Sequence, residues 1–392
     1  SCFDRYLDIL IFIGRFGDDG FGDRLFTYGF GYIRLRLLIA CAGRCLCSGY
    51  RRQRLWDDKG IQYDECSCCT QQARVDESPT IRLRKKLFEL IFLGTSASAP
   101  SARRNLPAIV VKHDEYRFLV DCGEGTQRQI LQSGIGFKRL NDILITHGHL
   151  DHILGLAGLL STFMRWETID ELRIHGGRSA LDRISDLLYG VVLRGGQAPM
   201  PIQMIALDPG VFWGAEDFTV SAFPVSHRGA DSMGFLFEEK GRKPFLPEKA
   251  AELGIPEGPW RRDLVDGKPV TLPDGRTIAP EEVLGEFRMG TRLAVVGDAG
   301  EVDSLVDVCR DVDGLVIEST YLDEEADMAR HFGHLTARKA ADLAIRAGAR
   351  QLFLTHISRR YREKDVLAEA QSVFPNVVVA RDFDTYTVKA PA

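Results

Sequence analysis

A compact run of metal-binding side chains constrains this chain more than any other feature. The apolar segment Asp142–Thr146 predicts a buried strand, and the residues His-Gly-His-Leu-Asp-His follow it at once. Imidazole and carboxylate groups are the ligands that zinc and similar ions prefer. Because a turn lets alternate side chains converge, whereas a helix spreads them around its axis, we expect a turn here. The predicted ligands are His147 and His149 for one metal ion, and Asp151 and His152 for a second.

Three later residues occupy the same kind of place in the sequence. Each is a metal-binding residue that closely follows an apolar segment: His227 after 218–223, Asp298 after 292–296 and His356 after 351–355. Active-site residues gather at such strand ends. Each of the three alone is explained equally well as an ordinary core or surface residue. Together they complete the coordination of two ions, and Asp298 is the natural carboxylate to bridge them.

The hydrophobic pattern from Phe88 onwards predicts a mixed α/β fold. The predicted strands are Phe88–Leu93, Ala108–Lys112, Tyr116–Val120, Asp142–Thr146, Phe218–Phe223, Met233–Glu238, Arg292–Val296, Gly314–Glu318, Gln351–Thr355 and Val377–Ala380. The predicted helices are Thr126–Ser133, Ile153–Phe163 and Thr336–Ala347, the last with Thr336 as N-cap and Gly348 as its stop. Since hairpins occur among the alternating strands and helices, we expect two sheets covered by helices, a four-layer sandwich.

Residues 1–86 differ from the rest of the chain. They contain no Met and no His, and they hold seven of the nine cysteines: Cys2, Cys41, Cys45, Cys47, Cys66, Cys68 and Cys69. The cysteine spacing is not that of a zinc ribbon or finger, although a metal site there stays open. A secreted disulfide framework would be spread through the fold, so reduced thiols fit better. We expect an extension outside the fold, followed by one folded domain over 87–392.

The overall charge sets a condition on any nucleic-acid partner. The net charge is −5 and the isoelectric point is about 6.0, so the chain has no general basic field. If RNA binds, the positive charge must be local. No uncharged apolar run is long enough for a membrane span, and we expect a cytoplasmic protein with no membrane partner.

The stretch Lys240–Gly275 interrupts the regular pattern with six prolines. Such a segment predicts an insertion that projects from the body of the fold with little core of its own. It carries both acidic and basic side chains, so its excess of positive charge is small. We expect a flexible arm over about residues 240–276.

The set of predicted ligands resembles the signature of the metallo-β-lactamase superfamily, from about Phe88 to the C-terminus. The resemblance implies a fold with αβ/βα layers and two zinc ions per chain. One zinc would be held by His147, His149, His227 and Asp298. The other would be held by Asp151, His152, Asp298 and His356.

Further motifs resemble the ribonuclease Z family within that superfamily. Residues 92–96 and 100–105 resemble its N-terminal strand and its Pro-x-Lys-x-Arg-Asn loop, with Ala102 where the family has Lys. The resemblance implies that Arg104 and Asn105 bind substrate. Residues 121–127 resemble the family's first motif, in which Asp121 would orient a histidine ligand.

Two more motifs of that family point to acid–base chemistry. Residues 317–320 and 333–336 resemble its His-Glu-Ala-Thr motif and its His-Ser-Thr loop, and they keep Glu318 and His334. The resemblance implies that these two residues act together on the leaving oxygen. Asp151 would take the proton of the attacking water.

The arm also resembles that of the ribonuclease Z family, with its Gly-Pro tip. The resemblance implies substrate contacts by Lys249, Gly258, Pro259, Arg261 and Arg262. It further implies that the arm grips the elbow of a precursor tRNA, from which the enzyme removes the 3′ trailer to leave a 3′-hydroxyl and a 5′-phosphate. It suggests a homodimer.

Two other functions remain possible on the sequence. One is a hydrolase of the same fold that acts on a small phosphodiester or another RNA, and the Gly-Pro arm argues against it. The other is a non-catalytic RNA-binding protein on an inactive scaffold, against which the complete set of ligands argues.

Overall fold

The computed structural model describes residues 53–56, 62–65, 87–167, 169–229 and 231–390. The chain divides into two compact units, Ser1–Arg82 and Leu83–Ala392. In the first unit, β1 (Gln53–Trp56) pairs with β2 (Gln62–Glu65) in antiparallel fashion. The cysteine motifs of the N-terminal extension lie outside the described residues.

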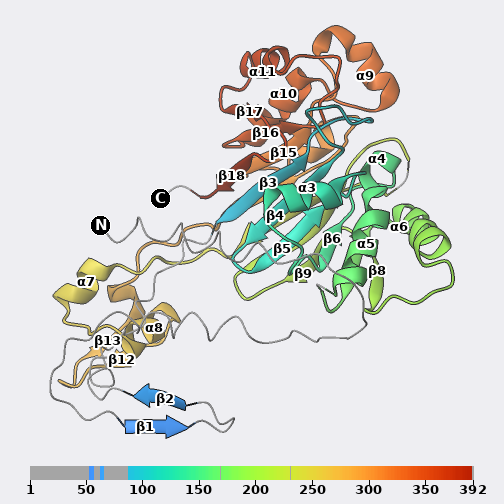
Figure 1. Ribbon diagram of the computed structural model, residues 1–392. Helices are drawn as coiled ribbons and strands as arrows, with labels where there is room; N and C mark the ends of the chain where they lie inside the picture. Colours follow the sequence, from blue (N-terminus) through green and yellow to red (C-terminus); the bar gives the residue numbers. More distant parts are fainter. Residues whose placement is uncertain (1–52, 57–61, 66–86, 168, 230, 391–392) are drawn as a thin grey trace, which may run out of the picture. The chain divides into compact units, whose positions relative to one another are not determined.

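Two seven-stranded mixed sheets form the second unit (Figure 1). The first has the order β18-β3-β4-β5-β6-β7-β8, with β3 (Phe88–Gly94), β4 (Ala108–His113), β5 (Tyr116–Val120), β6 (Asp142–Leu144), β7 (Leu172–Gly176), β8 (Ile202–Ala206) and β18 (Thr385–Val388). The second has the order β17-β16-β15-β14-β11-β10-β9, with β9 (Gly210–Gly214), β10 (Phe218–Pro224), β11 (Met233–Glu239), β14 (Arg292–Val295), β15 (Gly314–Glu318), β16 (Leu352–Thr355) and β17 (Val377–Val379).

The inner strands such as β3, β15 and β16 carry apolar residues on both faces, so each sheet can be covered on both sides. In β3, Phe88, Leu90 and Phe92 belong to the core between the two sheets, while Ile91 and Leu93 belong to the core under the helices. Phe353 of β16 meets Phe92 across the middle layer at 6.3 Å between ring centroids. The alternation along each strand therefore builds three apolar layers.

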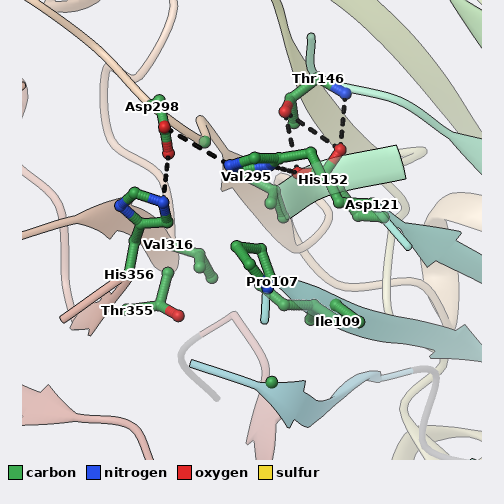
Figure 2. A pocket seen from close by; sticks show the side chains of 14 residues that line it. Pro107, Ile109, Asp121, Thr146, His152, Val295, Asp298, Val316, Thr355 and His356 are labelled. Atoms are coloured by element: carbon green, nitrogen blue, oxygen red, sulfur yellow. Dashed lines mark hydrogen bonds and ion pairs between the residues drawn. The ribbon is translucent and has the colours of Figure 1, made fainter. Parts of the chain in front are cut away.

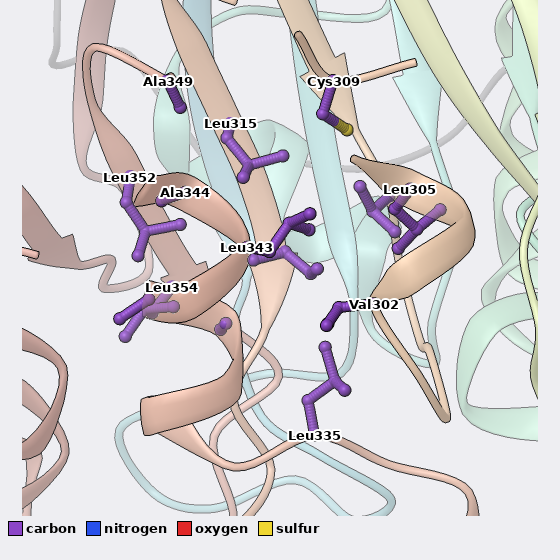
Figure 3. Packing of buried hydrophobic residues seen from close by; sticks show 14 of the residues in the cluster. Val302, Leu305, Cys309, Leu315, Leu335, Leu343, Ala344, Ala349, Leu352 and Leu354 are labelled. Atoms are coloured by element: carbon purple, nitrogen blue, oxygen red, sulfur yellow. The ribbon is translucent and has the colours of Figure 1, made fainter. Parts of the chain in front are cut away.

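Helices cover the outer face of each sheet. The first sheet is covered by α3 (Thr126–Ser133), α5 (Gly155–Trp166), α6 (Arg178–Ser185) and a π-helix, η2 (Asp186–Leu193). The second is covered by α10 (Ala337–Ala347) and α11 (Glu363–Gln371), and Figure 3 shows Leu343 and Ala344 of α10 among Leu315, Leu352 and Leu354 of the sheet. The predicted four-layer sandwich is confirmed.

Further short helices are α4 (Leu150–Ile153), α9 (Ala326–Phe332) and three 3-10 turns, Pro280–Glu282, Asp303–Leu305 and Asp323–Glu325. The expected turn around Asp151 and His152 was wrong, because both residues lie in α4, whose N-cap is His149. A single helical turn after an extended segment can still aim consecutive side chains at one place. Among the described residues, no helix is both long and apolar enough to cross a membrane.

The arm is inserted between β11 and β14, which pair with each other in the second sheet. It contains α7 (Pro247–Glu252), α8 (Pro259–Val265) and the hairpin of β12 (Val270–Thr271) and β13 (Thr277–Ile278). The expectation of little core was wrong, because seven buried apolar residues cluster here: Ala250, Ile255, Leu264, Val270, Leu272, Ile278 and Val283. Backbone bridges at Leu284 and Arg288 extend the arm past residue 276.

Candidate metal centre

The seven predicted ligands come together at strand ends from both sheets: Asp298 and His356 follow β14 and β16, His227 follows β10, and the other four follow β6. Strands β14, β15 and β16 run parallel, so the residues that follow them meet at one edge of the sheet. Two clusters of possible ligand atoms, which within each cluster all lie within 4.8 Å of one another, hold the seven predicted ligands: His147, His149, His227 and Asp298 in one, and Asp151, His152 and His356 in the other. A third group, Asp298, His334 and His356, overlaps both.

Asp298 lies between the two clusters and is almost fully buried. Its Oδ2 is 3.4 Å from Nε2 of His152 and 3.7 Å from Nε2 of His147, while its Oδ1 is 3.5 Å from Nε2 of His356. Figure 2 shows this carboxylate joined by dashed lines to His152 and His356. The carboxylate thus approaches histidines of both groups, which is the position that a bridging ligand needs.

Two threonines fix the tautomers of two histidines by the same device. Thr146 donates its hydroxyl proton to Asp121 Oδ2 at 2.8 Å, so its oxygen must accept from Nδ1–H of His147 at 3.0 Å. Thr320 donates to Glu318, so its oxygen accepts from Nδ1–H of His356 at 2.8 Å. In both rings the lone pair is left on Nε2, the atom that faces Asp298.

Two further histidines also direct Nε2 inward, and each is oriented by an oxygen atom that accepts a hydrogen bond from its Nδ1. Nδ1 of His152 donates to Asp121 Oδ2 at 2.8 Å, and Nδ1 of His227 donates to the carbonyl of Gly333 at 2.7 Å. His149 instead turns Nδ1 inward, 2.9 Å from Nε2 of His147. Asp121 therefore holds the predicted position beside a histidine ligand, and Thr146 and Thr320 extend the same support.

Three buried atoms at the centre have no hydrogen-bond partner: Nε2 of His152, Nε2 of His356 and Oδ1 of Asp298. An unsatisfied buried polar atom costs about 1–3 kcal/mol. All three lie in the region where the two ligand clusters meet, as Figure 2 shows for Asp298 and His356. These residues therefore fit divalent cations, which would take up the free lone pairs.

Burial and neighbouring charges shift the pKa values of the side chains at the centre in different directions. Burial lowers the pKa of His147 well below its usual value, and the nearby His152 lowers it further. At His152 burial opposes the charged form, but Asp298 and Asp121 outweigh it and raise the pKa of the imidazole well above its usual value. Burial alone would raise the pKa of Asp298, yet the neighbouring His356 and His152 lower it. A cation would replace the proton that balances these carboxylates.

The backbone takes unusual conformations at three points of the centre. Asp121 and His356 have φ values of 58° and 54°, a left-handed conformation that costs a non-glycine residue about 1–3 kcal/mol. Gly297, just before Asp298, has φ 77°, and a Cβ there would lie 2.9 Å from Cγ2 of Thr146. The glycine lets the end of β14 approach the histidine-rich segment.

His334 and Glu318 form a pair beside the ligands. Nδ1 of His334 is 2.9 Å from Oε1 of the fully buried Glu318, which also accepts from the backbone N–H of Ala299 at 2.8 Å. Burial disfavours the charged imidazole, but Glu318 outweighs it and raises the pKa of His334 to about 9. The ring stacks on His356 at 5.5 Å between centroids. The structure thus brings both predicted acid–base residues to the centre.

The substrate-binding candidates lie in other surroundings. Arg104 donates to Thr95, to the carbonyl of Ala380 and to Glu363, and Asn105 donates its side-chain N–H to the carbonyl of Glu124. In the arm, Gly258 is the N-cap of α8 with φ 120°, and Pro259 is its first residue. Arg261 donates to the carbonyl of Ile255, whereas Lys249 and Arg262 are exposed.

A four-layer αβ/βα fold with a His/Asp cluster at the strand ends defines a metal-dependent hydrolase of the metallo-β-lactamase fold. A family model described as anti-Pycsar protein Apyc1 matches residues 88–244. The crystal structure of the short form of human tRNase Z has a TM-score of 0.55 and 26% identity, and the match covers 76% of this chain and 99% of that one.

Curated relatives define the family more narrowly. Ribonuclease Z of Bradyrhizobium diazoefficiens is 49% identical over 302 residues, which are 77% of this chain and 100% of the relative. Ribonuclease Z of Gemmatimonas aurantiaca is 41% identical over 295 residues, with 74% and 93% coverage. The chain belongs to the ribonuclease Z family.

Proposed function

We propose that this chain removes the 3′ trailer from precursor tRNA with two zinc ions, leaving a 3′-hydroxyl on the tRNA and a 5′-phosphate on the trailer. As a ribonuclease Z, it is an endoribonuclease of tRNA 3′ processing. The observation that carries the two-ion proposal is the bridging position of Asp298 between two groups of ligand atoms. We also propose that it works in the cytoplasm.

The proposed ligands of the two ions are those named above: His147, His149 and His227 for one, Asp151, His152 and His356 for the other, and Asp298 for both. Five imidazoles with carboxylates are a donor set that suits zinc. When bound, two divalent cations lower the pKa of a water molecule and neutralise the charge of a phosphate placed over them.

Asp151 is the proposed acceptor of the proton from the attacking water. Its Oδ2 accepts from the backbone N–H of Ser98 at 3.0 Å and lies 3.5 Å from Nε2 of His356. Burial alone would raise the pKa of Asp151, but the neighbouring imidazoles of His356 and His152 lower it. The carboxylate is therefore ionised at neutral pH and fixed in direction by the loop at Ser98.

His334 is the proposed proton donor to the departing ribose oxygen. Its pKa of about 9 keeps it protonated at neutral pH, and Glu318 engages Nδ1, so Nε2–H is free to donate. Glu318 does not touch substrate in this scheme; it positions the ring and maintains its charge.

Recognition of the tRNA body is assigned to the arm. Lys249 and Arg262 are exposed and available for phosphate contacts, while Gly258 and Pro259 shape the start of α8. The arm belongs to the compact unit Leu83–Ala392, which we propose as the nuclease domain. We further propose a homodimer.

Cleavage of a precursor tRNA labelled at either end tests this function in the full chain. We expect one cut at the 3′ side of the tRNA, a 3′-hydroxyl on the tRNA product, and loss of cleavage with a chelator that zinc restores. Cleavage of bis(p-nitrophenyl) phosphate but not of precursor tRNA would contradict the proposal and favour a small phosphodiester as substrate.

A further inference from the structure

A cavity of about 760 Å³ adjoins the metal centre and is lined by arginines. They are Arg103, Arg104, Arg359, Arg362 and Arg381, and Glu363 is the one acidic residue in its lining. Ile357 and Ser358, which directly follow the predicted ligand His356, form part of its wall. We call this cavity the arginine basin.

The basin and the metal centre share two structural elements. The segment after β16 supplies His356 to the centre and Ile357 and Ser358 to the basin. The loop 96–105 pairs with Ile357 at Ser96, donates the N–H of Ser98 to Asp151, and places Arg103 in the basin. The basin is therefore built from the residues that directly follow His356 and from the loop that contacts Asp151.

The five arginines divide into two kinds. Arg104 and Arg381 both donate to Glu363, and Arg362 is paired with Asp365 at 2.7 Å. Arg103 and Arg359 are exposed, and neither forms an ion pair with any residue that the structure describes. Two positive charges in the basin are therefore left for an external anion.

Arg104 serves the basin in a different way. Its guanidinium also donates to Thr95 at 2.7 Å and to the carbonyl of Ala380. Since its donors are used within the protein, it anchors the loop that carries Arg103 to the residues around α11. This makes it a positioning residue rather than a direct phosphate ligand.

We propose that Arg103 and Arg359 bind backbone phosphates of the first nucleotides of the 3′ trailer. This inference rests on the proposed function. The scissile phosphate stays with the trailer, so the trailer begins at the metal centre beside the basin. The acceptor stem on the other side of the cut is a stiff paired helix, whereas the trailer is a single strand that can bend into a concave site.

Loss of two phosphate contacts to a single strand has a quantitative signature. Each contact contributes about 0.7 to the slope of log affinity against log salt, so removing two should lower the slope by about 1.4. A general loss of structure would not produce this change. A precursor with a one-nucleotide trailer, which offers no phosphate beyond the scissile one, should not respond.

The test compares Arg103→Gln/Arg359→Gln with wild type on precursor tRNAs that carry a one-nucleotide or a longer trailer. We expect KM to rise about tenfold for the long trailer and to change less than about twofold for the short one. The matched control, Arg310→Gln/Arg346→Gln, removes the same charge from exposed arginines that are paired with aspartates elsewhere. Arg103→Lys/Arg359→Lys keeps the charges and should retain the salt slope.

Three results would overturn the inference. They are equal losses on both trailers, a loss on bis(p-nitrophenyl) phosphate, and behaviour like that of the control. Failure of the proposed function looks different, because wild type would then cut neither precursor.

Discussion

The metal centre and the arm are built in opposite ways. The centre collects its proposed ligands from segments that are far apart in the sequence, and buried hydrogen bonds to Asp121, Thr146 and Thr320 orient three of the histidines. The arm is one continuous segment with a small core of its own and exposed basic side chains. The contrast implies that the proposed chemistry of the centre and the proposed tRNA contacts of the arm can be damaged separately.

The largest effect is expected at Asp298. Asp298→Ala removes the carboxylate that faces both ligand clusters, so we predict a loss of about a thousandfold or more on every substrate. Zinc content by mass spectrometry should fall in parallel. Asp303→Ala, at an exposed carboxylate, is the control. Turnover within about tenfold of wild type would contradict the claim that the metal centre depends on this carboxylate.

His334→Ala should lower kcat by about 10²–10⁴ while zinc stays bound. Because the pKa of His334 is raised to about 9, the imidazole is charged below that pH and loses its proton above it. Wild-type turnover should therefore fall as pH rises through about 9, and this limb should vanish in the variant. Loss of zinc from the variant would instead make His334 a ligand.

The threonine hydroxyls give an intermediate effect. Thr320→Val preserves shape but removes the acceptor for Nδ1–H of His356, and Thr146→Val does the same at His147. We expect zinc affinity to fall about 10–100-fold, as it does for other groups that orient metal ligands. Competition with a chelator measures this. Unchanged affinity in both variants would show that the tautomers are fixed in another way.

Replacing residues 243–287 by a short linker removes the arm and leaves the residues of the metal centre in place. We predict that KM for precursor tRNA rises about tenfold or more, because the exposed basic residues of the arm are lost. Turnover of bis(p-nitrophenyl) phosphate should stay near that of wild type. Equal losses on both substrates would mean that the arm supports the centre itself.

The smallest effect concerns stability within the arm. Leu264→Ala leaves a cavity in its core, at a cost of about 2–5 kcal/mol to the local unit. Limited proteolysis should then cut within the arm, while zinc content and the unfolding of the main sheets remain as in wild type. A matching change at the surface, Val265→Ala, should leave the arm resistant.

The sequence predicted what depends on short patterns. The apolar strands, the four layers and the convergence of ligands after strands followed from alternation and from the histidine-rich motif. It did not reveal the role of Thr146, which depends on Asp121, 25 residues away, or that of Thr320, whose partner His356 lies 36 residues further along the chain. The core of the arm was also missed, since prolines at Pro247 and Pro259 begin helices there rather than prevent them.

Arg104 is a single residue whose contacts could not be predicted from the sequence. The loop motif suggested a substrate contact, but the structure engages its guanidinium with residues more than 250 positions away, which no local pattern reports. Arg103, beside it in sequence, is the exposed one. Neighbouring residues of one type can thus have different roles that only tertiary contacts distinguish.

Anomalous diffraction from zinc-loaded crystals is the most direct test of the bridging carboxylate. Two peaks are expected, one beside His147, His149 and His227 and one beside Asp151, His152 and His356, with Asp298 between them. A single peak, or a second peak remote from Asp298, would contradict a centre with two ions.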